Sequence, residues 1–158
     1  MMLYHGTTVD IEEIDLQRSK PNKDFGKGFY LSADKEQAVA MADYKAMQID
    51  GSPIVNAFEF DEKKLEDASL KVKIFREYDG EWADFIFANR NNPAFGNVHD
   101  YDIVIGPIAN DRVGIQIRKY MEQEIDLPTF IDRLKYMKGM TLQYYFGTER
   151  AIKLLKKV

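Results

Sequence analysis

Hydrophobic and polar residues alternate in six short segments of the chain, a pattern that predicts half-buried β-strands. The segments cover residues 2–5, 29–31, 54–60, 70–75, 101–105 and 141–146. In the last segment, Leu142, Tyr144 and Phe146 fall on one face and Gln143 and Tyr145 on the other, because side chains alternate along a strand. The last predicted strand therefore carries Gln143 among aromatic residues.

Between these segments, apolar residues recur at the spacing of amphipathic helices. One helix is predicted after Asp34, another over residues 81–88, and three more after the capping residues Asn110 or Asp111, Asp126 and Thr148. Asp34 and Gln37 form a capping-box pattern. On the first helix, Ala38, Met41, Ala42 and Lys45 line one side, and the small alanines are expected to let the helix lie close to a sheet.

Further expectations concern burial and the ends of elements. The run at 103–105 is apolar throughout, which predicts a strand covered on both faces. The expected end points are Gly106 and Pro107 for that strand, Gly139 for the fourth helix, and Lys153, Lys156 and Lys157 for the fifth. The residues expected to face inward are Trp82 in the second helix, Phe130, Ile131, Leu134 and Met137 in the fourth, and Ala151, Ile152 and Leu155 in the fifth.

Strands with helices scattered between them predict an α+β fold, and 158 residues fit a single domain, 1–158, with a sizeable core. The net charge of −4 and the pI near 5.3 argue against general nucleic-acid binding, which needs a basic surface. The absence of cysteine excludes disulfides, thiolate zinc sites and a thiol nucleophile.

Two histidines make a poor set of metal ligands, so no metal cofactor is expected. The start of the chain lacks the layout of a signal peptide, and no apolar run approaches membrane-spanning length. The expected compartment is the cytoplasm, without membrane attachment.

Two stretches near the amino terminus combine glycine with aromatic residues. They read Tyr4-His5-Gly6-Thr7 and Phe25-Gly26-Lys27-Gly28-Phe29-Tyr30. Glycine adopts backbone angles that other residues avoid and lets a ligand approach the main chain, so Gly26 and Gly28 predict a tight turn before a strand. On local pattern alone, such a turn explains the second stretch, and His5 fits an ordinary half-buried histidine. Lys27 faces either a phosphate or water.

Together with Gln143, these stretches resemble the signatures of the ADP-ribosyltransferase superfamily, on the branch that includes the poly(ADP-ribose) polymerases and diphtheria toxin. That branch carries a histidine on an early strand, a tyrosine on the next, and usually a glutamate on a late strand. The chain also resembles a group of small bacterial proteins of this type, through residues 82–85, 101–107 and 143–151. The resemblance implies split antiparallel β-sheets flanked by helices.

The resemblance also implies NAD as substrate, with cleavage of the nicotinamide–ribose bond and transfer of ADP-ribose to a macromolecular acceptor. The Gly6 backbone would pair with the nicotinamide carboxamide, His5 would hydrogen-bond the adenosine ribose, and Tyr30 would stack on the nicotinamide ring. The remaining residues of the implied NAD site are Thr7, Gly26, Lys27 and Gly28.

Gln143 departs from the usual pattern. A glutamate in its place would bond the 2′-hydroxyl of the nicotinamide ribose and set a negative charge beside the forming oxocarbenium ion. Glutamine can make the hydrogen bond but supplies no charge, so slower chemistry, transfer of a single ADP-ribose or binding without turnover is expected. Glu149 and Glu59 are alternative sources of a carboxylate, ranked below Gln143.

Other readings of the chain stay open. A degenerate site would give a non-catalytic module that binds NAD or ADP-ribose, and a scaffold for protein contacts would have no nucleotide site at all. An RNA 2′-phosphotransferase fits poorly with the net acidity. The resemblance further suggests a bacterial toxin or regulator with a neutralising antitoxin protein as partner. Residues 99–102, His-Asp-Tyr-Asp, are interpreted as a solvated loop that enters a strand.

Overall fold

The computed structural model describes residues 1–94, 96–135 and 140–158. In these residues, seven strands form one sheet in the order β4-β5-β6-β2-β1-β3-β7. The strands are β1 (Met2–Thr7), β2 (Phe29–Ser32), β3 (Ile54–Glu59), β4 (Val72–Ile74), β5 (Ile103–Pro107), β6 (Leu142–Phe146) and β7 (Lys156–Lys157). The α-helices are α1 (Lys35–Ile49), α2 (Gly80–Arg90), α3 (Asp111–Met121), α4 (Leu127–Lys135) and α5 (Glu149–Ile152).

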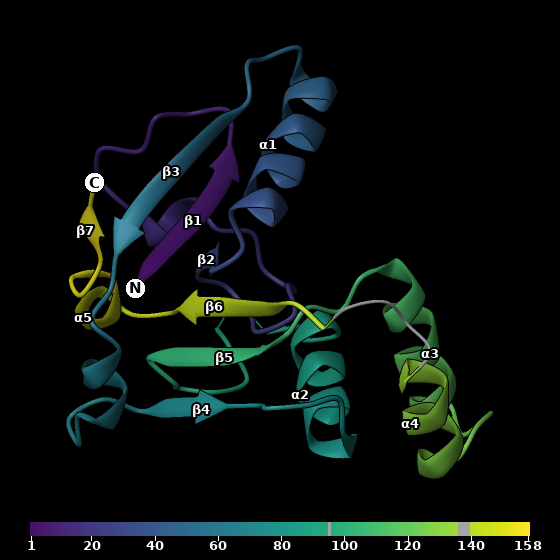
Figure 1. Cartoon of the computed structure of the whole chain (residues 1–158). Coiled ribbons are helices and arrows are strands. Elements are labelled where there is room, and N and C mark those ends of the chain that lie inside the picture. The colour runs from purple at the N-terminus through teal and green to yellow at the C-terminus, as the bar shows by residue number, and fades with distance from the viewer. Residues whose placement is uncertain (95, 136–139) are drawn as a thin grey trace.

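Neighbouring strands are antiparallel except β4 and β5, which are parallel. β1 and β3 run side by side and cross the direction of β6, β5 and β4 (Figure 1). Between these two groups, β1 and β2 are joined through a single pair, Tyr4 with Ser32, whereas six pairs join β1 to β3. The mixed sheet with its helices confirms the predicted α+β class.

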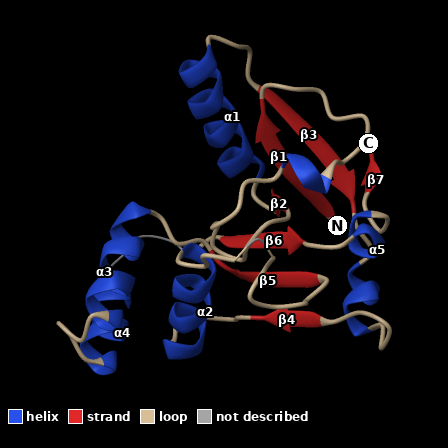
Figure 2. Ribbon diagram, turned by 180° about the vertical axis from the view of Figure 1, so that it is seen from behind, coloured by secondary structure: helices blue, strands red, loops and turns tan. Residues whose placement is uncertain are grey.

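The helices lie on different parts of the sheet. α1 runs along β1, α2 lies beside β4, β5 and β6, and α3 and α4 lie beyond α2, away from the sheet (Figure 2). The capping residues predicted for α1, α3, α4 and α5 are confirmed, because Asp34, Asn110, Asp126 and Thr148 each accept a backbone N–H of their helix. α2 begins earlier than predicted because Asp79 caps it.

Two apolar clusters cover the opposite faces of the sheet. Trp82 is fully buried in one of them and donates from its indole nitrogen to the Pro107 carbonyl oxygen at 3.1 Å, as a core tryptophan should. Val104 faces this cluster, and its neighbours Ile103 and Ile105 face the other. The prediction of a strand covered on both faces is therefore confirmed for β5.

Two predicted strand ends are wrong. β1 continues through Gly6 and Thr7, because both pair with β3. β5 continues through Gly106 and Pro107, which pair with β6. In both places, hydrogen bonding to the partner strand continues the β-ladder past glycine or proline, residues that are rare in strands.

The predicted end of the closing helix is also wrong. α5 ends at Ile152, and Lys156 and Lys157 form β7, which pairs with Phe58 and Glu59 of β3. The Lys157 ammonium donates to Asn56 Oδ1 at 2.6 Å and to the Ile11 carbonyl oxygen at 2.6 Å. These lysines therefore complete a sheet edge and do not complement a helix dipole.

Three smaller expectations are corrected. Met41 is 43 % exposed, so only the alanines of α1 face the sheet. The Asp34 N–H donates to Ser32 Oγ at 3.0 Å, the place that a capping box would give to Gln37. Asp102 is fully buried and accepts from Thr148 and Arg150, so the solvated loop expected over residues 99–102 is wrong at its last residue, whereas Asp100 is exposed.

Met137 and Gly139, predicted to line and to end the fourth helix, lie outside the described residues. Phe130 and Leu134 of that helix are buried, as predicted. Within the described ranges, no helix combines the length and the apolar character that crossing a membrane requires.

Candidate functional site

His5 lies where β1 and β2 diverge. Its Nδ1 is 2.7 Å from the Tyr30 carbonyl oxygen, which can only accept, so Nδ1 carries the proton. Burial lowers the pKa of His5 to about 4, an effect that exceeds the opposing contribution of this backbone bond. The imidazole is therefore neutral near pH 7, and Nε2 presents a lone pair that can accept a hydrogen bond.

Tyr30 holds the glycine turn closed. Its hydroxyl donates to the Gly26 carbonyl oxygen at 2.6 Å and accepts from the Phe25 N–H at 2.9 Å. Burial raises the pKa of this hydroxyl, so it stays protonated. The Lys23 ammonium lies 5.2 Å from the centre of the Tyr30 ring, which is cation–π distance. A planar ligand could stack on that side of the ring only if Lys23 moved.

Gly6 permits the close approach of α1 to β1. A Cβ at this position would lie 1.9 Å from the Ala38 carbonyl oxygen, which is backbone and cannot rotate away. The Gly6 carbonyl oxygen accepts from the Lys45 ammonium at 3.0 Å. Gly6 is therefore a packing residue whose main chain also offers a polar group at the divergence of the strands.

The ammonium groups of Lys23 and Lys45 place positive charge near His5, and that of Lys20 is close enough to repel both lysines. Burial lowers the pKa of Lys23 and of Lys45, and repulsion from Lys20 lowers both further. In the described part of the chain, no carboxylate lies within 4.0 Å of these three ammonium groups. Asp24 attracts Lys23 from beyond that distance, so the positive charge is only partly compensated, and a partly compensated group of like charges favours an anionic ligand.

Gln143 belongs to a polar network on β6. Its Nε2 donates to Asp24 Oδ2 at 3.1 Å. The Asp24 Oδ1 accepts from both Nε and Nη2 of Arg90 at 2.7 Å, and Nη2 also donates to the Ala109 carbonyl oxygen at 2.9 Å. Sequence reasoning missed Asp24 and Arg90, although Asp24 directly precedes the glycine stretch.

The structure places Tyr30 and Gln143 on one face of the sheet and His5 on the other. Ser32 pairs with both Tyr4 and Gln143, so the alternation along β2 and β6 places Tyr30 and Gln143 on one face of the sheet. The same alternation along β1 turns His5 to the opposite face, where its ring stacks on Phe29 at 4.5 Å. The three side chains therefore meet only through the backbone at the divergence of β1 and β2.

Lys27 and Gly28 lie on another part of the surface. The Lys27 N–H donates to Asn97 Oδ1 at 2.7 Å, and its carbonyl oxygen accepts from the Tyr145 hydroxyl at 2.9 Å. A Cβ at Gly28 would lie 2.2 Å from Tyr145, so this glycine serves packing. Lys27 lines a groove of about 330 Å³ together with Glu149.

The other predicted positions contribute less. Thr7 pairs with Ile54 at the end of β1, and Gly26 adopts a left-handed φ of 90° that favours glycine. Glu59 pairs with Met2 and Lys156, at the opposite end of β1 from His5. The carboxylate that contacts Gln143 is that of Asp24, and neither Glu59 nor Glu149 takes this position.

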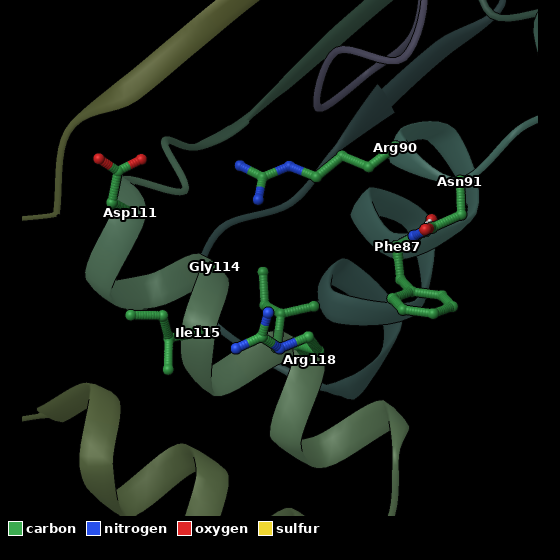
Figure 3. Close-up of a pocket in the computed structure, with 8 residues that line it drawn as sticks. Phe87, Arg90, Asn91, Asp111, Gly114, Ile115 and Arg118 are labelled. Atoms are coloured by element: carbon green, nitrogen blue, oxygen red, sulfur yellow. Dashed lines mark hydrogen bonds between the residues drawn. The ribbon is translucent and has the colours of Figure 1, made fainter.

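A pocket of about 410 Å³ opens between α2 and α3. Arg90 of α2 extends across it toward Asp111, and Arg118 of α3 projects into the same space (Figure 3). A Cβ at Gly114 would lie 2.8 Å from Arg90 Nη1, so this glycine leaves room for the guanidinium group. The pocket therefore exposes one side of the arginine whose other side binds Asp24.

Comparison with known proteins gives one match. A family model described as a protein of unknown function (DUF3990) matches residues 1–157. Searches of the curated proteins and of the solved structures found no significant match. Because the family model covers nearly the whole chain, the protein belongs to the DUF3990 family.

Proposed function

We propose that this protein is an NAD-dependent ADP-ribosyltransferase that transfers a single ADP-ribose to a macromolecular acceptor. The observation that carries the proposal is the strand order β6-β2-β1. It makes neighbours of the three strands that bear Gln143, Tyr30 and His5, although these residues are far apart in the sequence. The divergence of β1 from β2 supports the split-sheet architecture that the resemblance implies.

The charges around the divergence suit a dinucleotide. The neutral His5 imidazole offers Nε2 as an acceptor for a ribose hydroxyl, which always has a proton to donate. The ammonium groups of Lys20, Lys23 and Lys45 supply positive charge for a diphosphate. Displacement of Lys23 by the diphosphate would free one side of the Tyr30 ring for nicotinamide.

Gln143 limits the rate of the proposed chemistry. A neutral hydrogen bond contributes about 1 kcal/mol net, against about 1.5–3 kcal/mol for one to a charged group. A preorganised charge beside a forming cation contributes still more in the transition state. Slow transfer of one ADP-ribose follows from this difference, and polymer synthesis does not fit.

The test has two steps. The protein is first titrated with NAD and with nicotinamide by calorimetry, beside a His5→Ala variant that removes the proposed ribose contact. Cell lysate is then incubated with the protein and isotope-labelled NAD, and modified macromolecules are identified by mass spectrometry. Binding weakened in His5→Ala, with labelled ADP-ribose on an acceptor, supports the proposal. An absence of NAD binding by the unaltered protein refutes it.

A second candidate is a non-catalytic module that binds NAD or ADP-ribose. It is favoured by the neutral Gln143 amide and by the Lys23 ammonium over the Tyr30 ring. Binding without release of nicotinamide over many hours would select this candidate over the enzyme.

A further inference from the structure

We propose that Asp24 and Arg90 form a clamp that orients the Gln143 side chain. In this orientation, Oε1 of Gln143 faces the nicotinamide ribose and accepts a hydrogen bond from its 2′-hydroxyl group. This inference rests on the proposed function, since the ribose belongs to NAD. Asp24 and Arg90 act as positioning residues, because they reach the ligand only through Gln143.

The orientation of the Gln143 amide follows from the chemistry of its partner. An ionised carboxylate only accepts hydrogen bonds, so the amide group must turn its NH₂ toward Asp24. The two ends of a side-chain amide point in different directions from the same carbon atom. Oε1 is therefore directed away from Asp24 and remains available as an acceptor.

Asp24 is itself held in place. Two nitrogens of Arg90 grip one carboxylate oxygen, and the Ala109 N–H lies 3.4 Å from the other, the one that accepts from Gln143. The side chain of Asp24 is 15 % exposed and that of Arg90 is 34 % exposed. Partial removal from water strengthens such charge-assisted bonds, so the carboxylate that orients Gln143 has little freedom to rotate.

The position of Arg90 depends in turn on Gly114. Figure 3 shows the arginine extending from α2 past this glycine of α3. A Cβ at Gly114 would come within 2.8 Å of Arg90 Nη1 and would displace the guanidinium group. Among the described residues, a Cβ at Gly114 would come within 4 Å of Arg90 alone, so this substitution would reach Asp24 and Gln143 only through Arg90.

The clamp also gives a physical reason for glutamine at position 143. A glutamate there would bring a second carboxylate within hydrogen-bond distance of Asp24. Two carboxylates at that distance cannot both ionise without strong repulsion, so one would keep a proton. Glutamine next to Asp24 supplies the acceptor for a sugar hydroxyl without this conflict. The departure from the usual glutamate is therefore coupled to Asp24.

The first experiment needs no ligand. The side-chain NH₂ hydrogens of Gln143 are followed by NMR in the unaltered protein and in Asp24→Ala, with Asp84→Ala on the exposed face of α2 as the matched control. The clamp predicts slow solvent exchange in the unaltered protein and in the control, and faster exchange in Asp24→Ala. Equal exchange rates in all three proteins would overturn the clamp.

The second experiment compares NAD with an analogue that lacks the 2′-hydroxyl of the nicotinamide ribose. We expect the unaltered protein to prefer NAD about fivefold, the ratio that one neutral hydrogen bond supports. Asp24→Ala should abolish this preference, and Gly114→Ala should reduce it.

Exchanging the carboxylate and the amide between positions 24 and 143 should restore the preference for NAD. In the double variant Asp24→Asn with Gln143→Glu, the amide and the carboxylate trade places, so the hydrogen bond between positions 24 and 143 is restored with total charge unchanged. The preference for NAD over the analogue should return to at least fivefold. A double variant that folds, binds NAD and lacks the preference would contradict the inference.

The failures are distinguishable. Binding of NAD with equal preference in the unaltered protein and in Asp24→Ala overturns the clamp and leaves the proposed function standing. An absence of NAD binding to an unaltered protein with protected Gln143 hydrogens overturns the proposed function, and with it the sugar contact of Oε1. Thermal unfolding of each variant shows whether a lost preference reflects a lost fold.

Discussion

The two sides of the β1–β2 divergence differ in how their charges are balanced. On the β1 side, Lys23 and Lys45 lie near His5 without a carboxylate within ion-pair distance in the described residues. On the β6 side, Asp24 and Arg90 neutralise each other and bind Gln143. The lysines of the β1 side have no ion-pair partner among the described residues, whereas the charges of Asp24 and Arg90 on the β6 side are paired.

This difference in charge pairing predicts which side rearranges when a ligand binds. Uncompensated charge is relieved by an anion, so the lysines of the β1 side should rearrange. A closed network loses hydrogen bonds if it moves, so the β6 side should stay in place. Substitutions and pH changes on the two sides test this contrast.

The largest effect is expected from Gly6→Ala. The new Cβ would overlap the Ala38 carbonyl oxygen, so α1 would have to move away from β1 and carry Lys45 with it. Overpacking of this kind costs about 3 kcal/mol or more in the free energy of unfolding, measured by denaturant titration. Gly96→Ala is the control, because no atom lies within 4 Å of the added methyl group. Equal stability of the two variants would show that α1 tolerates displacement.

A smaller loss is expected from Arg90→Ala. It leaves the Asp24 carboxylate, 15 % exposed, without its main partner, and loss of a charged hydrogen bond costs about 1.5–3 kcal/mol. Lys71→Ala removes an exposed ion pair with Asp100, which solvent screens, and should cost much less. Denaturant unfolding of both variants makes the comparison. If Arg90→Ala lowers the free energy of unfolding no more than Lys71→Ala does, Asp24, Arg90 and Gln143 do not form a closed network.

The lysines should govern affinity more than stability. Lys45→Ala is expected to weaken NAD binding about tenfold through loss of one charged contact to phosphate, and the loss should shrink as salt is added. Calorimetry at two salt concentrations measures this. Lys153→Ala, exposed beyond α5, should bind NAD as the unaltered protein does. Identical NAD affinities of the Lys45→Ala and Lys153→Ala variants would contradict binding of the diphosphate on the β1 side.

The last prediction concerns the pH dependence of stability. The pKa of His5 in the folded protein, about 4, lies below its ordinary value of 6.5, so the unfolded chain binds more protons between these values. Stability is therefore complete above pH 6.5 and declines as pH falls toward 4, by up to about 1.4 kcal/mol per pH unit. Burial also lowers the pKa of His99, which contributes in the same direction.

Unfolding measured from pH 7 to pH 4.5 tests this slope. His5→Asn should flatten it only in part, because His99 still titrates, and the double variant with His99→Asn should flatten it further. A slope that is unchanged in both variants would assign the acid sensitivity to carboxylates such as Asp102, whose pKa is lowered in the folded protein by its hydrogen bonds despite its burial.

Much of the local structure could be predicted because it depends on neighbours in the chain. The faces of β6, the cap of α1 at Asp34 and the burial of Trp82 follow from side-chain alternation, helix capping and apolar spacing. Local preference misled where a partner strand overrode it, as at Pro107 in β5 and at Lys156 in β7.

The sequence by itself determined the α+β class, the principal strands and the glycine stretches that brought His5, Tyr30 and Gln143 to attention. The tertiary structure alone decided that Gln143 meets Asp24 and that Lys45 meets Gly6, because these partners are 119 and 39 residues apart. Contacts at such separations depend on strand order and helix placement, which no local pattern encodes. For this reason the charge balance of the site emerges only when the chain is folded.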